Sequence, residues 1–122
     1  MWLFTSFGFF SVVRKSGEQH LTVRARCSPD RDRLRQQFMP GLSATSTKGG
    51  HDYPFRATIS QPDFAKGMAL LGTSLDYNNF KDEVAEKMGQ ERADTYQHVW
   101  STLRAIANEK PAKPPTAEKN LR

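Results

Sequence analysis

The sequence predicts an α+β domain in which a small sheet packs against three to four helices. A Phe- and Val-rich run opens the chain, two later segments alternate apolar and polar residues as strands do, and the second half has the spacing of amphipathic helices. The 122 residues suffice for a single hydrophobic core. We therefore expect one domain over residues 1–108, followed by a disordered, basic tail rich in Pro and Lys over residues 109–122.

The opening segment FTSFGFFSVV, residues 4–13, contains four phenylalanines and no charge. It is too short for a membrane-spanning helix, which needs about 20 apolar residues, and no positive charge precedes it as in a signal peptide. Apolar residues occupy both of its alternating faces, which is typical of a strand that is covered above and below. We therefore predict a central strand in a cytoplasmic protein that does not associate with membranes.

Two further strands are predicted from alternation, LTVRARC at residues 21–27 and YPFRATI at residues 53–59. The short polar turn at residues 15–19 predicts a hairpin between the first two strands. A helix between the second and third strands predicts that these two are parallel. The simplest three-stranded sheet then has the order 2-1-3, a split βαβ unit like half of a ferredoxin-like fold, with a right-handed crossover.

Capping residues mark the predicted helices. Ser28 and Ser60 each precede a proline and an aspartate, which is typical of a helix start, and Asn79 is a third predicted N-cap. Gly89 follows an apolar pattern and should end a helix. The predicted helices span residues 29–38, 61–75, 80–88 and 90–108.

Composition limits the chemistry. Cys27 is the only cysteine, and the three histidines are far apart in the sequence, so we expect no disulfide, no metal site and no cofactor. The net charge of +5 comes from residues 1–50 and from the tail, since residues 51–108 carry six basic and eight acidic side chains. A basic first half is compatible with an acidic partner or a nucleic acid, without requiring either.

An aromatic and basic surface is the first candidate site. On the predicted sheet, two phenylalanines would share a face with three arginines of the neighbouring strands. Aromatic rings beside guanidinium groups suit single-stranded nucleic acid, because rings stack on bases and cations contact phosphates. The alternative is that the rings are buried beneath helices or in a dimer interface, since aromatic residues usually serve packing. The candidate residues are Phe7, Phe9, Arg24, Arg26 and Arg56.

Phe7-Gly8-Phe9 is similar to the aromatic octamer of RNA-recognition motifs, (K/R)-G-F-G-F-V-x-F, whose aromatic residues stack on bases. The match departs from that motif, because Thr5 stands at the leading basic position and Val12 at the last aromatic one. The octamer also belongs on a later strand of that fold. The resemblance implies an RNA- or DNA-binding alternative.

A second candidate is the corner between the second and third predicted helices. It groups several polar side chains that have no evident capping role, and a small ligand would find hydrogen-bonding partners there. The alternative is a helix–helix corner fixed by local hydrogen bonds. The residues are Asp76, Tyr77, Asn78 and Lys81.

Four segments together resemble a family of small bacterial hypothetical proteins. They are MWLFTSFGFFSVVRK at the start, DYPFRA (52–57), DYNNFKDEVAEK (76–87) and the Tyr-x-x-Val-Trp of residues 96–100. The resemblance implies a cytoplasmic domain and no particular activity.

The sequence favours a non-enzymatic interaction or regulatory module that acts through protein–protein contacts or homodimerisation. A nucleic-acid-binding accessory protein is the alternative. An enzyme is the least supported class, because no nucleophile lies at a recognisable spacing from a base.

Overall fold

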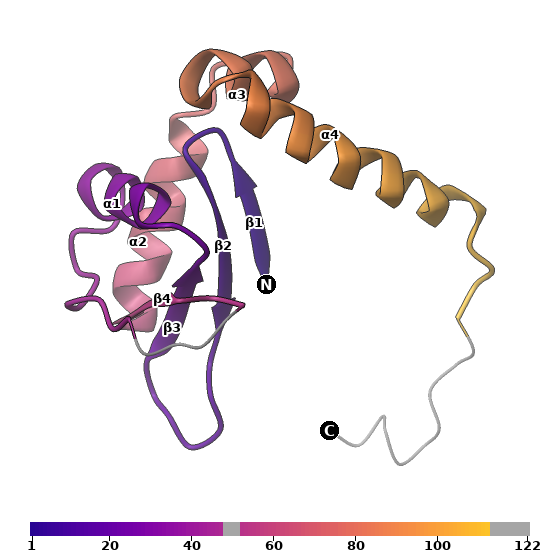
Figure 1. Ribbon diagram of the computed structural model, residues 1–122. Helices are drawn as coiled ribbons and strands as arrows, with labels where there is room; N and C mark the ends of the chain where they lie inside the picture. The colour runs from indigo at the N-terminus through magenta and orange to yellow at the C-terminus, as the bar shows by residue number, and fades with distance from the viewer. Residues whose placement is uncertain (48–51, 113–122) are drawn as a thin grey trace.

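The computed structural model describes residues 1–47 and 52–112 as an α+β domain (Figure 1). The strands are β1 (Trp2–Thr5), β2 (Gly8–Val13), β3 (Leu21–Ala25) and β4 (Phe55–Ile59). The helices are α1 (Ser28–Gln37), α2 (Gln61–Thr73), α3 (Phe80–Met88), α4 (Gln90–Leu103) and the short 3-10 helix η1 (Arg104–Asn108). The predicted α+β class is therefore confirmed. Most of the predicted tail, residues 113–122, lies outside the described residues.

The topology of the sheet differs from the prediction. The sheet has four strands in the order β1-β2-β3-β4, and each neighbouring pair is antiparallel. The predicted three-stranded order 2-1-3 with a split βαβ crossover is therefore wrong. Residues 38–54 separate α1 from β4 in the sequence, and β4 pairs antiparallel with β3. A helix between two strands does not make them parallel when a long segment follows it.

The opening segment is a hairpin and not a single central strand. Thr5 of β1 is paired with Gly8 of β2, and the turn lies at Ser6 and Phe7. The Thr5 hydroxyl donates a hydrogen bond of 2.6 Å to the Gly8 carbonyl and accepts one of 3.3 Å from the Phe7 amide, which fixes the turn. The two-sided apolar pattern belongs to β2, which contributes to a hydrophobic cluster on each side of the sheet.

One face of the sheet, here termed the core face, packs against α1, α2 and the segment that follows α1. Phe10 is fully buried in this cluster, together with Leu34 of α1 and Met39. Gly67 of α2 lies so close that a Cβ there would be 2.5 Å from the Met39 Cγ. The other buried members are Val12, Leu21, Val23, Ala25, Leu42, Ala57 and Ile59. The core face is thus the main hydrophobic core.

Side-chain caps begin two of the four α-helices. The Ser60 and Asn79 side chains accept hydrogen bonds of 3.2 Å and 3.0 Å from amides of the first turns of α2 and α3, so both predicted caps are confirmed. At α1 the N-cap position is Cys27, which makes no side-chain capping bond. Ser28 is the first helical residue, and the predicted Ser28 cap is therefore wrong.

α3 and α4 form a helical pair beside the β1–β2 hairpin. A single residue, Gly89, ends α3 and precedes α4, and its φ of +100° favours glycine. Ala93 and Tyr96, in the first part of α4, are buried together with Val84 of α3. The far half of α4 extends away from the rest of the domain (Figure 1). The second face of the sheet, which carries Phe9 and packs against this pair, is here termed the α4 face.

Candidate functional site

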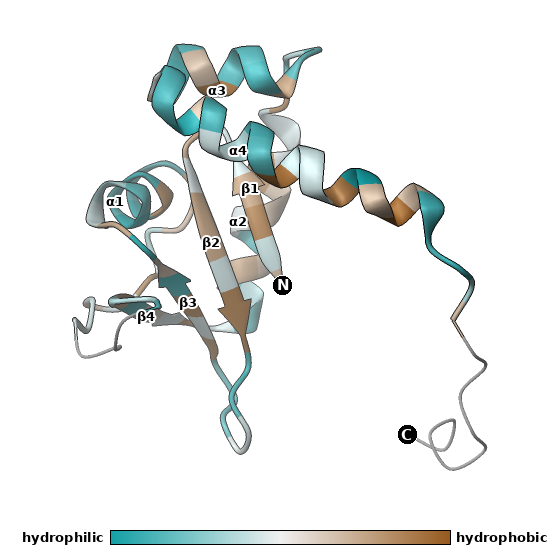
Figure 2. Ribbon diagram, turned by 45° about the vertical axis from the view of Figure 1, so that its right-hand side comes forward, coloured by the Kyte–Doolittle hydropathy of each residue, from teal (hydrophilic) through white to brown (hydrophobic). Residues whose placement is uncertain are grey.

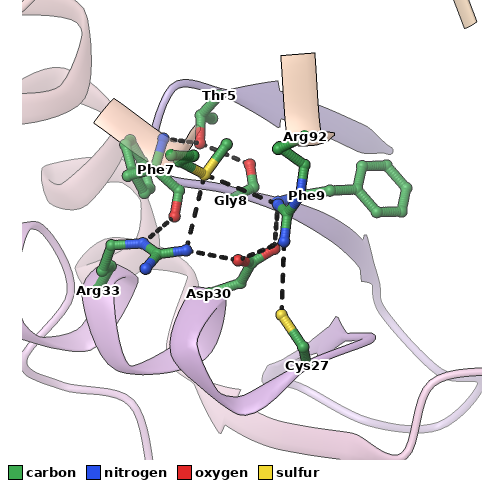
Figure 3. Close-up of polar contacts among 9 residues, drawn as sticks. Thr5, Phe7, Gly8, Phe9, Cys27, Asp30, Arg33 and Arg92 are labelled. Atoms are coloured by element: carbon green, nitrogen blue, oxygen red, sulfur yellow. Dashed lines mark hydrogen bonds and ion pairs between the residues drawn. The ribbon is translucent and has the colours of Figure 1, made fainter. Parts of the chain in front are cut away.

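A buried carboxylate connects the β1–β2 hairpin to α1 and α4 (Figure 3). Asp30, in the first turn of α1, is only 2% exposed. Its Oδ2 accepts hydrogen bonds of 2.9 Å from the Phe9 amide and from Nη1 of Arg92. Its Oδ1 accepts bonds of 2.7 Å from Nη2 of Arg33 and 3.1 Å from Nη2 of Arg92. Arg92 therefore binds both carboxylate oxygens, which is the strongest geometry for such a pair.

The two arginines also contact sulfur atoms. Nη2 of Arg33 and Nη1 of Arg92 lie 3.6 Å and 3.7 Å from the Met88 Sδ, and Nη2 of Arg92 lies 3.6 Å from the Cys27 Sγ. Burial alone would lower the pKa of Arg92, but its hydrogen bonds to Asp30 outweigh this effect and raise it. The guanidinium is thus charged at every pH at which the protein folds. Together the two arginines carry one positive charge more than the carboxylate neutralises.

This network requires a glycine in β2. A Cβ at Gly8 would lie 2.8 Å from the Asp30 Cβ and 2.7 Å from the Phe10 Cζ, closer than side chains approach one another. The carbonyl oxygen of the preceding residue, Phe7, accepts a hydrogen bond of 2.6 Å from Nε of Arg33. The hairpin therefore approaches α1 closely enough to be hydrogen-bonded through its backbone.

A cavity of about 370 Å³ lies between the α4 face and the first half of α4. The Phe4 and Phe9 ring centres are 4.7 Å apart, Trp2 meets Phe9 edge-on at 6.1 Å, and Tyr96 meets Phe4 edge-on at 5.4 Å. Tyr53 completes the aromatic walls. This cavity, here termed the α4 pocket, is within the size range of small-molecule sites.

Three charged residues also line the α4 pocket, namely Arg26, Asp30 and Arg92. Because Asp30 accepts four hydrogen bonds, its negative charge is already compensated by Arg92 and Arg33. The pocket thus combines aromatic walls with a surplus of positive charge.

The hydroxyl of Tyr96 is buried, and no side chain in the described part of the chain makes a hydrogen bond of good geometry with it. The Tyr96 ring stacks on Phe80 at 5.8 Å, and the Arg92 guanidinium carbon lies 5.9 Å from the ring centre. Burial raises the pKa of Tyr96, and Arg92 offsets part of the rise through a poorly aligned hydrogen-bonding contact and through its positive charge. The hydroxyl is therefore neutral at neutral pH and costs stability, because it is removed from water without a good partner.

The two phenylalanines of the first candidate surface lie in different places. Phe7 is in the hairpin turn, and its ring centre lies 4.7 Å from that of Phe38 and 5.9 Å from that of Phe10, against the main core. Phe9 lines the α4 pocket. The structure thus does not bring the two rings together. The aromatic residue that is exposed beside Phe9 is Trp2, which the sequence analysis did not single out.

The three arginines of that surface do gather on the α4 face. Arg24 and Arg56 are paired across β3 and β4. The guanidinium carbons of Arg24 and Arg26 lie 4.7 Å and 4.6 Å from the centre of the Tyr53 ring. Arg24 also donates a hydrogen bond of 2.6 Å to the Ser11 hydroxyl. Tyr53, which was predicted to begin a strand over residues 53–59, precedes β4, and its ring contacts Arg24 and Arg26.

The predicted polar corner is divided by the structure. Asp76 and Tyr77 line a second cavity of about 560 Å³ between this corner and the hairpin turn, whereas Asn78 and Lys81 do not line it. Burial and the charges of Glu83 and Asp76 raise the pKa of Tyr77. The charged residues of this cavity are two basic and two acidic side chains, so it favours no particular ligand charge.

Sequence reasoning did not identify Asp30 or Arg92. An aspartate in the first turn of a helix is common because it interacts favourably with the helix dipole, which conceals any second role. The spacing of Asp30 and Arg33 on one helix does indicate a pair. Nothing local connects Asp30 with Arg92, 62 residues later.

No group of three His, Cys, Asp or Glu side chains that would hold a metal ion is present in residues 1–47 and 52–112. No helix of these ranges is long and apolar enough to cross a membrane. The chain matches no protein-family model, and no curated protein and no solved structure is significantly similar to it. The resemblance to a family of bacterial proteins therefore stays a prediction, and the function is inferred from the arrangement of the residues.

Proposed function

We propose that this chain is a small non-enzymatic interaction module that homodimerises through the far half of α4 and the adjoining η1. Trp100, Leu103 and Ile106, here termed the distal stripe, are 56%, 51% and 56% exposed. Their spacing of three residues brings them to one side of the helix. Figure 2 shows hydrophobic residues along this projecting end of α4. The exposure of these three large side chains carries the proposal.

The distal stripe continues a surface that α4 buries within its own domain. Ala93 and Tyr96, one to two turns before Trp100, pack in the cluster with Val84 of α3. Beyond Tyr96 the helix leaves the body of the domain, and the same side of the helix is exposed. An apolar helix face that is buried along only part of its length is normally completed by a partner.

A second copy of the chain fits the chemistry of the stripe. Within residues 97–108, Arg104 is the only side chain that carries a full charge at pH 7. Its guanidinium carbon lies 5.6 Å from the Trp100 ring centre, where it shields part of the indole. Two such faces, each with one fully charged side chain, can pack together across a two-fold axis, and the two-fold dimer is the commonest oligomer.

The mass in solution tests the proposal. Leu103→Gln places an amide in the stripe, and Leu70→Gln is its matched control, since Leu70 is equally exposed at 51% but lies on α2. We expect light scattering to give the mass of a dimer for the parent protein and for Leu70→Gln, and a monomer for Leu103→Gln. A parent protein that is monomeric at every concentration, or equal behaviour of the two variants, contradicts the proposal.

Nucleic-acid binding is the second candidate function, favoured by a row of residues across the α4 face. The strand register aligns Trp2, Ser11, Arg24 and Arg56 from β1 to β4. An exposed indole on the same sheet face as two guanidinium groups supports base stacking and phosphate contact. Fluorescence anisotropy with a mixed-sequence single strand tests this role. Affinity that falls steeply with salt and is weakened by Arg24→Gln would favour this role, and salt-independent or absent binding would exclude it.

A further inference from the structure

The α4 pocket has features of a ligand site that packing alone does not explain. Its volume is about 370 Å³, and five aromatic residues line it. Aromatic walls with a few convergent polar groups are the usual lining of small-molecule sites. The ring contacts among Trp2, Phe4 and Phe9 keep these walls in a fixed arrangement, which suits a flat apolar group.

The charged residues that line the pocket determine which ligand charge it favours. Asp30 is bound by Arg92 at both oxygens and by Arg33 at one, so no net negative charge remains at this end. Arg26 is exposed, and its guanidinium rests over Tyr53 while its Nη1 donates a hydrogen bond of 2.9 Å to the Asp52 carbonyl. Counted over Arg26, Asp30 and Arg92, the lining carries one positive charge. A ligand with one negative charge would complement it.

We propose that the α4 pocket binds a small aromatic carboxylate, with its ring against Trp2 and Phe9 and its carboxylate at Arg26. A planar carboxylate matches the guanidinium fork, and the aromatic walls contact the ring. Arg92 shapes the pocket, because its hydrogen bonds to Asp30 hold α4 against α1. Since these bonds occupy its guanidinium group, Arg26 is the residue that recognises the charge of the ligand. No residue of the distal stripe lines the pocket, so this proposal does not depend on the dimer.

The chain carries an internal control for binding at this place. Its two tryptophans are Trp2, which lines the pocket, and Trp100, which does not. Titration with 1-naphthoate, followed by the two indole N–H resonances, should shift the Trp2 signal and leave the Trp100 signal in place. Trp100→Phe assigns the two signals. A shift of Trp100 alone, equal shifts of both, or no shift of Trp2 would overturn the proposal.

A neutral probe separates recognition of charge from apolar binding. We expect Arg26→Gln to weaken the binding of 1-naphthoate by about tenfold or more, because a charge-assisted hydrogen bond is lost. The affinity for 1-naphthalenemethanol should be unchanged. Arg14→Gln removes an equal charge from an exposed residue that does not line the pocket and should change neither affinity. Equal weakening of both probes by Arg26→Gln, or no weakening of 1-naphthoate, would contradict the proposal. Light scattering of the same samples reports the dimer independently.

Discussion

The two faces of the sheet are packed in different ways. On the core face, Phe10, Leu34 and Met39 are almost completely buried in an entirely apolar cluster. On the α4 face, aromatic rings surround a cavity, and a buried carboxylate meets two guanidinium groups at its edge. β2 contributes to both, with Phe10 on one side and Phe9 on the other. The same strand stabilises the fold on one side and lines the candidate site on the other.

The difference in packing between the core face and the α4 face indicates which face stabilises the fold and which holds the candidate site. Burial of apolar surface contributes about 25 cal/mol per Å², so the core face needs no other explanation. A buried ion pair contributes little net stability, because the cost of removing charges from water nearly equals their attraction. The α4 face therefore retains features that packing alone does not favour, which supports assigning the ligand site to it.

The largest effect is expected from a substitution that breaks the hydrogen-bond network of Asp30 at the α4 face. Asp30→Asn keeps the shape of the side chain but leaves Arg33 and Arg92 without their negative charge. We expect a loss of about 2–4 kcal/mol in the free energy of unfolding, somewhat below the cost at a fully buried pair because both guanidinium groups still touch water. Asp32→Asn is the matched control: Asp32 pairs with Arg31 at the surface, and its loss should cost at most about 1 kcal/mol.

Urea denaturation of the two variants measures this difference. Equal losses for Asp30→Asn and Asp32→Asn would show that the carboxylate does not hold the α4 face together.

A methyl group at Gly8 tests the contact between the two faces. The added Cβ would meet both Phe10 of the core face and Asp30 of the network. We expect Gly8→Ala to cost about 1–3 kcal/mol, as overpacking does. Gly72→Ala adds the same atom to α2, where nothing lies within 4 Å, and should stabilise by up to about 1 kcal/mol because alanine favours helix. Thermal denaturation measures the stability of both variants. Equal melting temperatures would show that the hairpin moves to accommodate the added methyl group at little cost.

The smallest effect concerns Tyr96, whose buried hydroxyl lacks a good partner. At neutral pH we expect Tyr96→Phe to be as stable as the parent or more stable by up to about 1 kcal/mol, since it removes an unsatisfied polar group. Burial raises the pKa of Tyr96 in the folded state above the ordinary value of 10.0. The contribution of Tyr96 to the free energy of unfolding is therefore fully present below pH 10.0, and it is lost as the pH rises through the folded-state pKa.

The groups that face Tyr96 are Arg92, Asp30 and Arg33, and Arg92 limits the size of this shift. The loss of stability above pH 10.0 should therefore be modest and should shrink in Tyr96→Phe, with the remainder due to Tyr77, whose pKa is also raised. Stability curves of parent and variant that fall in parallel at alkaline pH would exclude this role of Tyr96.

The secondary structure was largely predictable because its signals are local. The helix predicted at residues 80–88 matches α3, since an asparagine cap and a terminal glycine define both of its ends. The hairpin turn was missed because Thr5-Ser6-Phe7-Gly8 has none of the usual turn dipeptides such as Asn-Gly. That error moved Phe7 onto the wrong surface and, with the parallel pairing assumed for the later strands, produced the wrong strand order.

The candidate site was predictable only where it follows strand alternation. Arg24 and Arg56 lie on one face as expected, because side chains paired directly across neighbouring strands point the same way. The carboxylate network was not predictable, since it joins Asp30 to Arg92 through the tertiary fold. Contacts of this separation have no local pattern in the sequence.

The α3–α4 pair, joined by one glycine, has a consequence for motion in the native state. Its two helices contact each other closely and are near in the sequence, so they can remain paired while detached from the sheet. Their attachment depends on Arg92 and on the rings around Tyr96, whereas the core face lies elsewhere. We therefore expect the pair to open as a cooperative unit before global unfolding. Amide hydrogens of α3 and α4 will exchange with solvent together, and sooner than those of β2 and β3. A ligand in the pocket would slow that exchange by bridging the sheet and the detachable helices.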